Sequence, residues 1–165
     1  MTRLPCIRFV RLATRDDADG ACEAVRRSIT EICGPDYGHE EKVMSDWLAN
    51  KTRDILKTWI ESPDRYCVVA VLPSSEIVGF GQVNRSGCVE LCYVAPAGLH
   101  QGYGRAMLQA MERQGVQWGL ETLHLHSSLT AKSFYERNGY RLKGEAKMFG
   151  STLGDFPMAK KLVPE

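Results

Sequence analysis

The segment from residue 91 to residue 108 constrains the fold most, because it joins a strand, a glycine-bearing loop and a helix without interruption. An apolar, strand-like run ends at Pro96, three glycines follow, and apolar residues then recur at helical spacing from Ala106 onward. In such an arrangement the free N–H groups of the helix N-terminus face the loop, and glycine lets a ligand approach the backbone closely. The segment has no acidic residue and includes Arg105. It therefore predicts a site for a phosphate-bearing ligand.

The glycine pattern excludes two common nucleotide-binding loops. No Gly-Lys-Ser/Thr follows Gly104, so the loop is not the phosphate loop of nucleotide hydrolases. The spacing of Gly98, Gly102 and Gly104 also differs from the dinucleotide fingerprint, and the loop comes after several strand-like runs rather than in a first βαβ unit. Taken alone, the pattern fits an ordinary strand-to-helix turn equally well.

A second segment, residues 127–140, strengthens the functional interpretation. It reads Ser-Ser-Leu-Thr-Ala-Lys-Ser-Phe-Tyr-Glu-Arg-Asn-Gly-Tyr, with Ala131, Phe134, Tyr135 and Asn138 at helical spacing. The Asn-Gly pair at 138–139 is a helix stop, and the alternating Leu-His-Leu-His before the segment predicts a strand. A short helix following a strand is therefore expected here.

Together the two segments resemble the GCN5-related N-acetyltransferase (GNAT) family, most closely its small bacterial members. In that family a Val-x-Pro strand end and a Gln/Arg-x-x-Gly-x-Gly/Ala loop bind the pyrophosphate of acetyl-CoA. An Ala-x-x-Phe-Tyr-x-x-x-Gly-Phe/Tyr helix then carries a tyrosine beside the CoA thiol. The resemblance spans most of the chain, from a strand that begins at residue 7 to one near residue 160.

The resemblance implies an α/β fold of the α+β type: a central, mostly antiparallel sheet of about seven strands flanked by helices. The sheet splays after the strand at 88–94 and leaves a gap in which pantetheine pairs with exposed backbone groups. Pro96 fits the end of that strand, because proline cannot donate to a ladder. The residue is equally compatible with an ordinary strand end.

The resemblance also implies which residues contact acetyl-CoA. Two of them depart from the family pattern: Leu99 stands at the Gln/Arg position, and Ser128 stands where many members have asparagine. The Leu99 side chain cannot hold the pyrophosphate, although backbone amides still can, and Ser128 keeps a hydroxyl. The implied residues are Cys92, Tyr93, Val94, Leu99, His100, Gln101, Gly102, Tyr103, Gly104, Arg105 and Ser128.

The implied activity is direct transfer of an acetyl group from acetyl-CoA to an amine in a ternary complex, with Tyr135 as the acid. A tyrosine of pKa near 10 stays protonated at neutral pH and can protonate a leaving thiolate of pKa near 8.5. The mismatch costs only about 2 kcal/mol. The alternative is that Tyr135 packs with Phe134 against the sheet. A non-catalytic acyl-CoA-binding or regulatory domain, or transfer to a hydroxyl, also remains open.

Glu90 is the expected base. Freeing a charged primary amine at pH 7 costs about 4 to 5 kcal/mol, which a positioned carboxylate can lower. Strand alternation predicts that Glu90 shares a face with Cys88 and Cys92. The alternatives are a solvent-facing Glu90 or one paired with Arg85. The histidines at 124 and 126 are expected to be satisfied strand residues, with a proton-relay role left open.

Acceptor specificity is expected from residues 28–47 and 148–156, by the same resemblance. There Ile32, Tyr37 and Trp47 predict an apolar or aromatic amine pocket, or ordinary packing. The acceptor is expected to be a small-molecule or peptide amine, and the sequence does not choose among such amines.

Composition agrees with one domain over residues 1–165, large enough for a single core. A net charge of +1 gives no case for binding nucleic acid or an anionic membrane. The six cysteines have no zinc spacing, so no metal is expected. Because no signal peptide or membrane-spanning run is present, the cytoplasm is the expected location, and a homodimer is compatible with the sequence.

The rest of the chain predicts further elements by periodicity. A capping box at Thr14 and Asp17 should begin the first helix. The expected strands are 7–12, 67–72, 77–83, 88–94, 140–148 and 157–162, with a turn at 150–155, and two more helices are expected at 39–50 and 53–61.

Overall fold

The structure, a computed structural model, describes residues 9–163. The first two residues of the strand predicted at 7–12 lie outside this range. The strands are β1 Phe9–Leu12, β2 Arg65–Val71, β3 Ile77–Asn84, β4 Val89–Val94, β5 Thr122–Ser127, β6 Arg141–Leu142, β7 Lys147–Phe149 and β8 Thr152–Lys161. The helices are α1 Ala18–Glu31, α2 Glu41–Leu48, α3 Arg53–Glu61, α4 Tyr103–Gln117 and α5 Lys132–Arg137, with short 3₁₀ turns η1 Arg15–Asp17, η2 Gly34–Tyr37 and η3 Pro96–Gly98.

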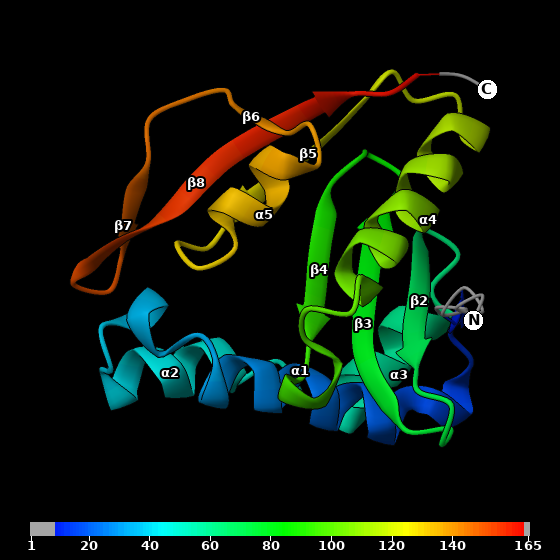
Figure 1. Cartoon of the computed structure of the whole chain (residues 1–165), viewed down its shortest axis with the longest axis horizontal. Helices are drawn as coiled ribbons and strands as arrows, with labels where there is room; N and C mark the ends of the chain where they lie inside the picture. The colour runs from blue at the N-terminus through cyan, green and yellow to red at the C-terminus, as the bar shows by residue number, and fades with distance from the viewer. Residues whose placement is uncertain (1–8, 164–165) are drawn as a thin grey trace, which may run out of the picture.

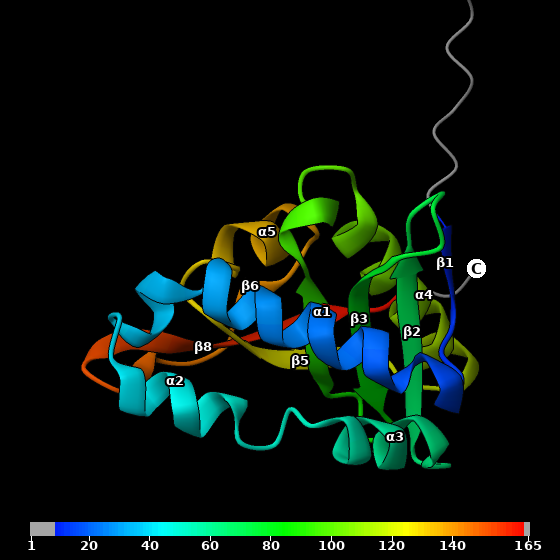
Figure 2. The same cartoon turned by 90° about the horizontal axis from the view of Figure 1, so that it is seen from below.

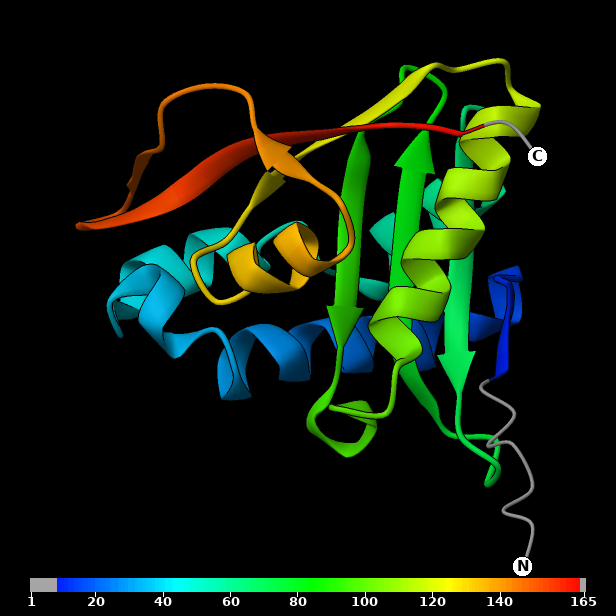
Figure 3. The ribbon, with the colours of Figure 1, turned by 45° about the horizontal axis from the view of Figure 1, so that its top comes forward.

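The strands form two antiparallel sheets that separate between β4 and β5 (Figure 1). The first has the order β1-β2-β3-β4, and the second has the order β5-β8-β6, with β7 on β8. Between β4 and β5 the described residues form one isolated bridge, Cys88 with His124. From this point the strands diverge, and α5 lies beside the widening gap (Figure 3). The predicted fold class and splay are confirmed, and residues 9–163 contain eight strands in two sheets.

Helices cover both faces of the first sheet. On one face, α1 and α3 pack over a core that includes Val69, Phe80 and Leu91; Figure 2 shows α1 running across the strands. On the other face, α4 buries Met107 and Met111. This second core continues into β5, β8 and α5, so it joins the two sheets although their backbones hardly pair.

The start of α1 follows the predicted capping box. The Asp17 carboxylate accepts a hydrogen bond from the Thr14 backbone N–H at 2.8 Å. Arg11 of β1 donates two further bonds to the same carboxylate, and this contact lowers the pKa of Asp17 from its usual value. Hydrogen bonds to Asp17 thus connect the start of α1 both to the preceding turn and to β1.

Two boundary predictions are wrong for local reasons. The helix predicted at 39–50 begins only at Glu41, because Gly38 and His39 both have a φ of 57°, which a helix does not tolerate. The turn predicted at 150–155 is confined to the beginning of that range. Gly150, with a φ of 64°, reverses the chain at once, and Phe149 pairs with Thr152. The strand predicted at 140–148 is also interrupted between β6 and β7.

Within residues 9–163, no helix has both the length and the apolar character needed to cross a bilayer.

Candidate active site

The gap between the two sheets opens into a cavity of about 1200 Å³. The first turn of α4, the edge of β4, the end of β5 and one side of α5 all contribute to its walls. Two of the predicted site residues, Gln101 and Tyr37, do not line it. Those that do are Ile32, Trp47, Glu90, Cys92, Tyr93, Val94, Leu99, His100, Gly102, Tyr103, Gly104, Arg105, Ser128 and Tyr135.

The loop before α4 has the geometry of an anion cradle. His100 and Gly102 both adopt left-handed conformations, with φ of 59° and 84°, and Gly102 is the N-cap of α4. The unpaired N–H groups of the first helical turn therefore face the cavity, with Arg105 at its edge. A Cβ added to Gly104 would lie 3.2 Å from the Phe134 ring. These residues fit the pyrophosphate of CoA.

The edge of β4 that faces the gap supplies a second contact surface. Residues from Gly79 to Gln82 of β3 pair with Val94 to Leu91 on one side of the strand. On the other side, β5 has already diverged, so alternate N–H and C=O groups point into the cavity. Such an edge pairs readily with an extended, amide-containing chain such as pantetheine.

Tyr135 of α5 is 7 % exposed and lines the cavity. It contacts the Cys92 thiol, and its ring lies 5.1 Å from the Phe134 centroid. Burial raises the pKa of Tyr135 well above its usual value and raises the pKa of Cys92 to about 12. The same desolvation therefore favours the neutral forms of both the phenol and the thiol.

Glu90 lies on the opposite face of the sheet from the one that alternation predicted. Val89 pairs with Val83 and Leu91 with Gln82, so Glu90 is the extra residue of a β-bulge. The bulge turns its carboxylate toward Gln82, under α1 and α3, and away from Cys92. The expectation that Glu90 and Cys92 share a face is therefore wrong.

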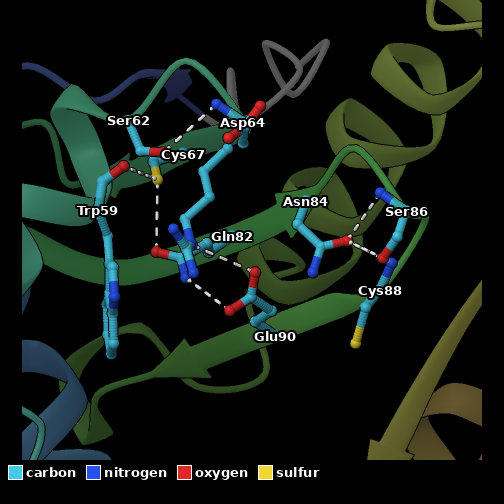
Figure 4. Close-up of polar contacts among 10 residues, drawn as sticks. Trp59, Ser62, Asp64, Cys67, Gln82, Asn84, Ser86, Cys88 and Glu90 are labelled. Carbon is cyan, nitrogen blue, oxygen red and sulfur yellow. Dashed lines mark hydrogen bonds and ion pairs between the residues drawn. The ribbon is translucent and has the colours of Figure 1, made fainter.

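The Glu90 carboxylate already has partners there (Figure 4). Gln82 donates to it at 3.4 Å, and the Arg65 guanidinium lies 3.3 Å from its second oxygen. Gln82 in turn accepts from the Cys67 thiol. The alternative pairing with Arg85 is wrong, because Arg85 donates to the Pro63 carbonyl and stacks on Trp118.

A buried carboxylate that the sequence did not single out for this contact fixes the loop before α5. Asp36 of η2 is 0 % exposed and accepts hydrogen bonds from the N–H and the hydroxyl of Thr130, at 2.7 and 2.6 Å. Next to it, the Ser128 hydroxyl accepts from the Ala131 N–H. Asp36 and Thr130 are 94 positions apart, so no local pattern signals the contact. The pair ties the N-terminal helices to the helix that carries Tyr135.

We expect Asp36→Ala to lower the free energy of unfolding by about 2 kcal/mol, since it removes the buried carboxylate that accepts two hydrogen bonds from Thr130. Urea unfolding measures the change. Asp46→Ala is the matched control: its side chain is 70 % exposed and forms a surface ion pair with Lys42, so we expect a change within about 0.5 kcal/mol. Equal losses in the two variants would contradict a structural role for Asp36.

Aromatic side chains form the far wall. Trp47 of α2 lines the cavity and packs against Phe149, with ring centroids 5.0 Å apart. It also donates from Nε1 to the Tyr93 hydroxyl at 3.1 Å. Tyr37 is buried behind Trp47, 6.3 Å from its ring, so it supports the wall rather than forming it.

Four further cavity residues were not singled out as site residues from the sequence. Arg137 ends α5 and Asn138 is its C-cap, and the helical spacing alone did not show which face would be open. His126 and Asp155, from β5 and β8, lie opposite β4. Among the described residues, no group of three His, Cys, Asp or Glu side chains is positioned to hold a metal ion.

The comparisons with known proteins agree with this geometry. Residues 33–162 match the sequence model of the acetyltransferase (GNAT) domain. No curated protein is significantly similar to the chain in sequence. Solved structures share the fold at low identity, and several of them, including the following two, are similar over nearly their whole length.

A GCN5-related N-acetyltransferase from Rhodopseudomonas palustris, also described as "Aminotransferase, Class-II", has a TM-score of 0.81 at 20% identity, over 98% of this chain and 100% of its own. The PaiA N-acetyltransferase of Thermoplasma acidophilum, solved in complex with coenzyme A, has a TM-score of 0.75 at 20% identity, over 93% and 98%. With the family match covering most of the sequence, the chain belongs to the GNAT acetyltransferase family.

Proposed function

We propose that the protein transfers an acetyl group from acetyl-CoA to a primary amine by direct attack within a ternary complex. One observation carries the proposal: the anion cradle, the open edge of β4 and Tyr135 all line a single cavity. These are the three contacts needed for a pyrophosphate, a pantetheine arm and a leaving thiolate. Similar folds solved with coenzyme A support the same ligand.

In this proposal Tyr135 protonates the sulfur as the C–S bond breaks. Burial favours the neutral phenol, so Tyr135 keeps its proton until negative charge develops beside it. Two groups are available to deprotonate the amine, Glu90 and His126, since both line the cavity.

We further propose that the acceptor carries one cationic amine on an apolar or aromatic body. Ile32, Trp47, Met148 and Phe149 give the cavity an apolar wall. Among its lining residues, Glu90 and Asp155 are the two carboxylates, and each is paired with a basic side chain. A polycationic acceptor would bring several positive charges into the cavity, where both lining carboxylates already have a basic partner. Aminoglycosides, the acceptors named for two similar folds, are therefore disfavoured.

Thiol release from acetyl-CoA, with product masses, tests the activity and the acceptor class together. The amines are phenethylamine, aniline, spermidine and kanamycin, and 2-phenylethanol tests for O-acetylation. We expect acetylated phenethylamine with a kcat/KM well above that of spermidine or kanamycin. Binding of CoA without transfer to any acceptor would instead support a non-catalytic domain.

We expect Trp47→Ala to raise the KM for phenethylamine by about 10- to 10²-fold, because it removes an aromatic contact worth about 1.5–3 kcal/mol. Steady-state kinetics measure the change. Trp118→Ala is the control, since Trp118 stacks under Arg85 and does not line the cavity. An unchanged KM in Trp47→Ala would mean that the acceptor does not bind against Trp47.

A further inference from the structure

Two residues of the second sheet form a hydrogen-bonded pair that lines the same cavity. His126 lies in β5, and its Nδ1 is 2.7 Å from Oδ1 of Asp155 in β8. The antiparallel pairing of His126 with Pro157 holds the two side chains together across adjacent strands. Strands β5 and β8 thus fix the orientation of the His126 imidazole in the wall of the cavity.

The pairing determines which nitrogen of His126 can accept a proton. An ionised carboxylate only accepts hydrogen bonds, so Nδ1 must carry the proton that Asp155 binds. In the neutral ring the lone pair is then on Nε2. Among residues 9–163, the bond to Asp155 is the one hydrogen bond of this imidazole. The His126 side chain is 59 % exposed, so a proton taken up at Nε2 can leave to solvent.

His126 and Tyr135 reach the gap from opposite faces of the second sheet. Leu123 and Leu125 point into the core that contains Tyr135, and alternation along β5 turns His126 the other way. An acid that protonates the thioester sulfur and a base that deprotonates the amine act at different atoms, so they must lie at different places in the cavity. Tyr135 contacts Cys92 of β4, whereas His126 contacts Asp155 of β8, the strand that also pairs with β7 and its Phe149.

Glu90, the other candidate, is already engaged. Its two oxygens contact Arg65 and Gln82, at 3.3 and 3.4 Å. The Arg65 guanidinium already occupies the position beside Oε1 as an ion pair, although that oxygen makes no hydrogen bond within the described residues, so an incoming ammonium would have to compete with this cation. The Nε2 atom of His126 can accept a proton without losing a partner, because the bond to Asp155 is made at Nδ1.

We propose that His126, held by Asp155, is the general base that deprotonates the acceptor amine; this rests on the proposed acetyl transfer. Nε2 takes one proton from the ammonium group, and the free amine attacks the thioester carbonyl. A C–N bond forms, the C–S bond breaks, and Tyr135 gives its proton to the sulfur. An ammonium loses two protons on becoming an amide: one leaves through His126, and the other replaces the proton that Tyr135 donated. Asp155 is a positioning residue.

The test compares His126→Ala with the wild-type protein, using acetyl-CoA and phenethylamine, which is charged at pH 7. We expect kcat to fall about 10²-fold or more, with unchanged CoA affinity by calorimetry. Imidazole added to the solution should restore part of the rate in proportion to its concentration, because the site is open to solvent. Aniline, which is neutral at pH 7, should be acetylated at nearly the wild-type rate.

His124→Gln is the matched control, since His124 lies two residues earlier on the same face and does not line the cavity. We expect no change in its kcat. Asp155→Asn should lower kcat less than His126→Ala does, with little effect on KM and without rescue by imidazole.

Three outcomes would overturn the proposal. If the wild type acetylates phenethylamine and His126→Ala does so at the same rate, the base is not His126, although the proposed function stands. If Glu90→Gln instead shows the loss that is selective for the charged amine, the base is Glu90. If the wild type acetylates no acceptor, the proposed function fails, and the base fails with it.

Discussion

Tyr135→Phe should bind acetyl-CoA normally and lose about 10²- to 10⁴-fold in turnover. The phenyl ring keeps the contacts with Phe134 and Tyr140, so folding is preserved. Only the hydroxyl is lost, and the thiolate must then leave without a proton donor. Burial raises the pKa of Tyr135 well above its usual value, so the wild type should show no loss from its ionisation between pH 7 and 9. Stopped-flow or steady-state thiol release measures the rate, and calorimetry measures binding.

Tyr140→Phe provides the control for this prediction. Tyr140 is as deeply buried, and its ring lies 5.7 Å from that of Tyr135, but it does not line the cavity. We expect its turnover to stay near that of the wild type. If Tyr135→Phe kept full turnover while chemistry was shown to limit the rate, Tyr135 would be a packing residue only.

Gly104→Val should abolish measurable CoA binding. A Cβ at this position would lie 3.2 Å from the Phe134 ring and 3.6 Å from Val94, and the branched side chain would extend into the anion cradle. The backbone of the first helical turn could then no longer approach the pyrophosphate. Isothermal calorimetry with CoA measures the affinity, and circular dichroism checks the fold.

Gly144→Val is the matched control for this substitution. A Cβ there meets only Pro157, at an ordinary contact distance of 3.4 Å, and the residue lies outside the cavity. We expect wild-type CoA affinity. Wild-type affinity in a folded Gly104→Val protein would mean that CoA does not use this loop. Gly104→Val and Tyr135→Phe are also distinguishable from each other, since the first removes CoA binding and the second removes turnover.

The family and the local structure of its two characteristic segments were predictable because their signals are local. The Pro96 strand end, the glycines before α4 and the stop after α5 each act on neighbouring backbone, so a short stretch of sequence contains all the atoms involved. Gly102 has the positive φ that only glycine adopts easily, and Gly139 ends α5 in the same conformation. The family match over residues 33–162 confirmed the family that these segments predicted.

The position of Glu90 was not predictable from its strand. Alternation assumes a regular register, and the bulge between β3 and β4 depends on how two strands pair. One extra residue reverses the face of a side chain, so a correct strand assignment gave the wrong neighbours for the carboxylate.

The sequence by itself determined the glycine-bearing loop before α4, the helix that carries Tyr135 and the apolar faces of α1 and α4, since each is set by spacing along one element. Tertiary structure alone decided which polar groups meet across elements: Asp36 with Thr130, Glu90 with Arg65, and His126 with Asp155. These contacts join positions 94, 25 and 29 residues apart, so they form only after the sheets, their register and their separation have been established by packing of the shared core.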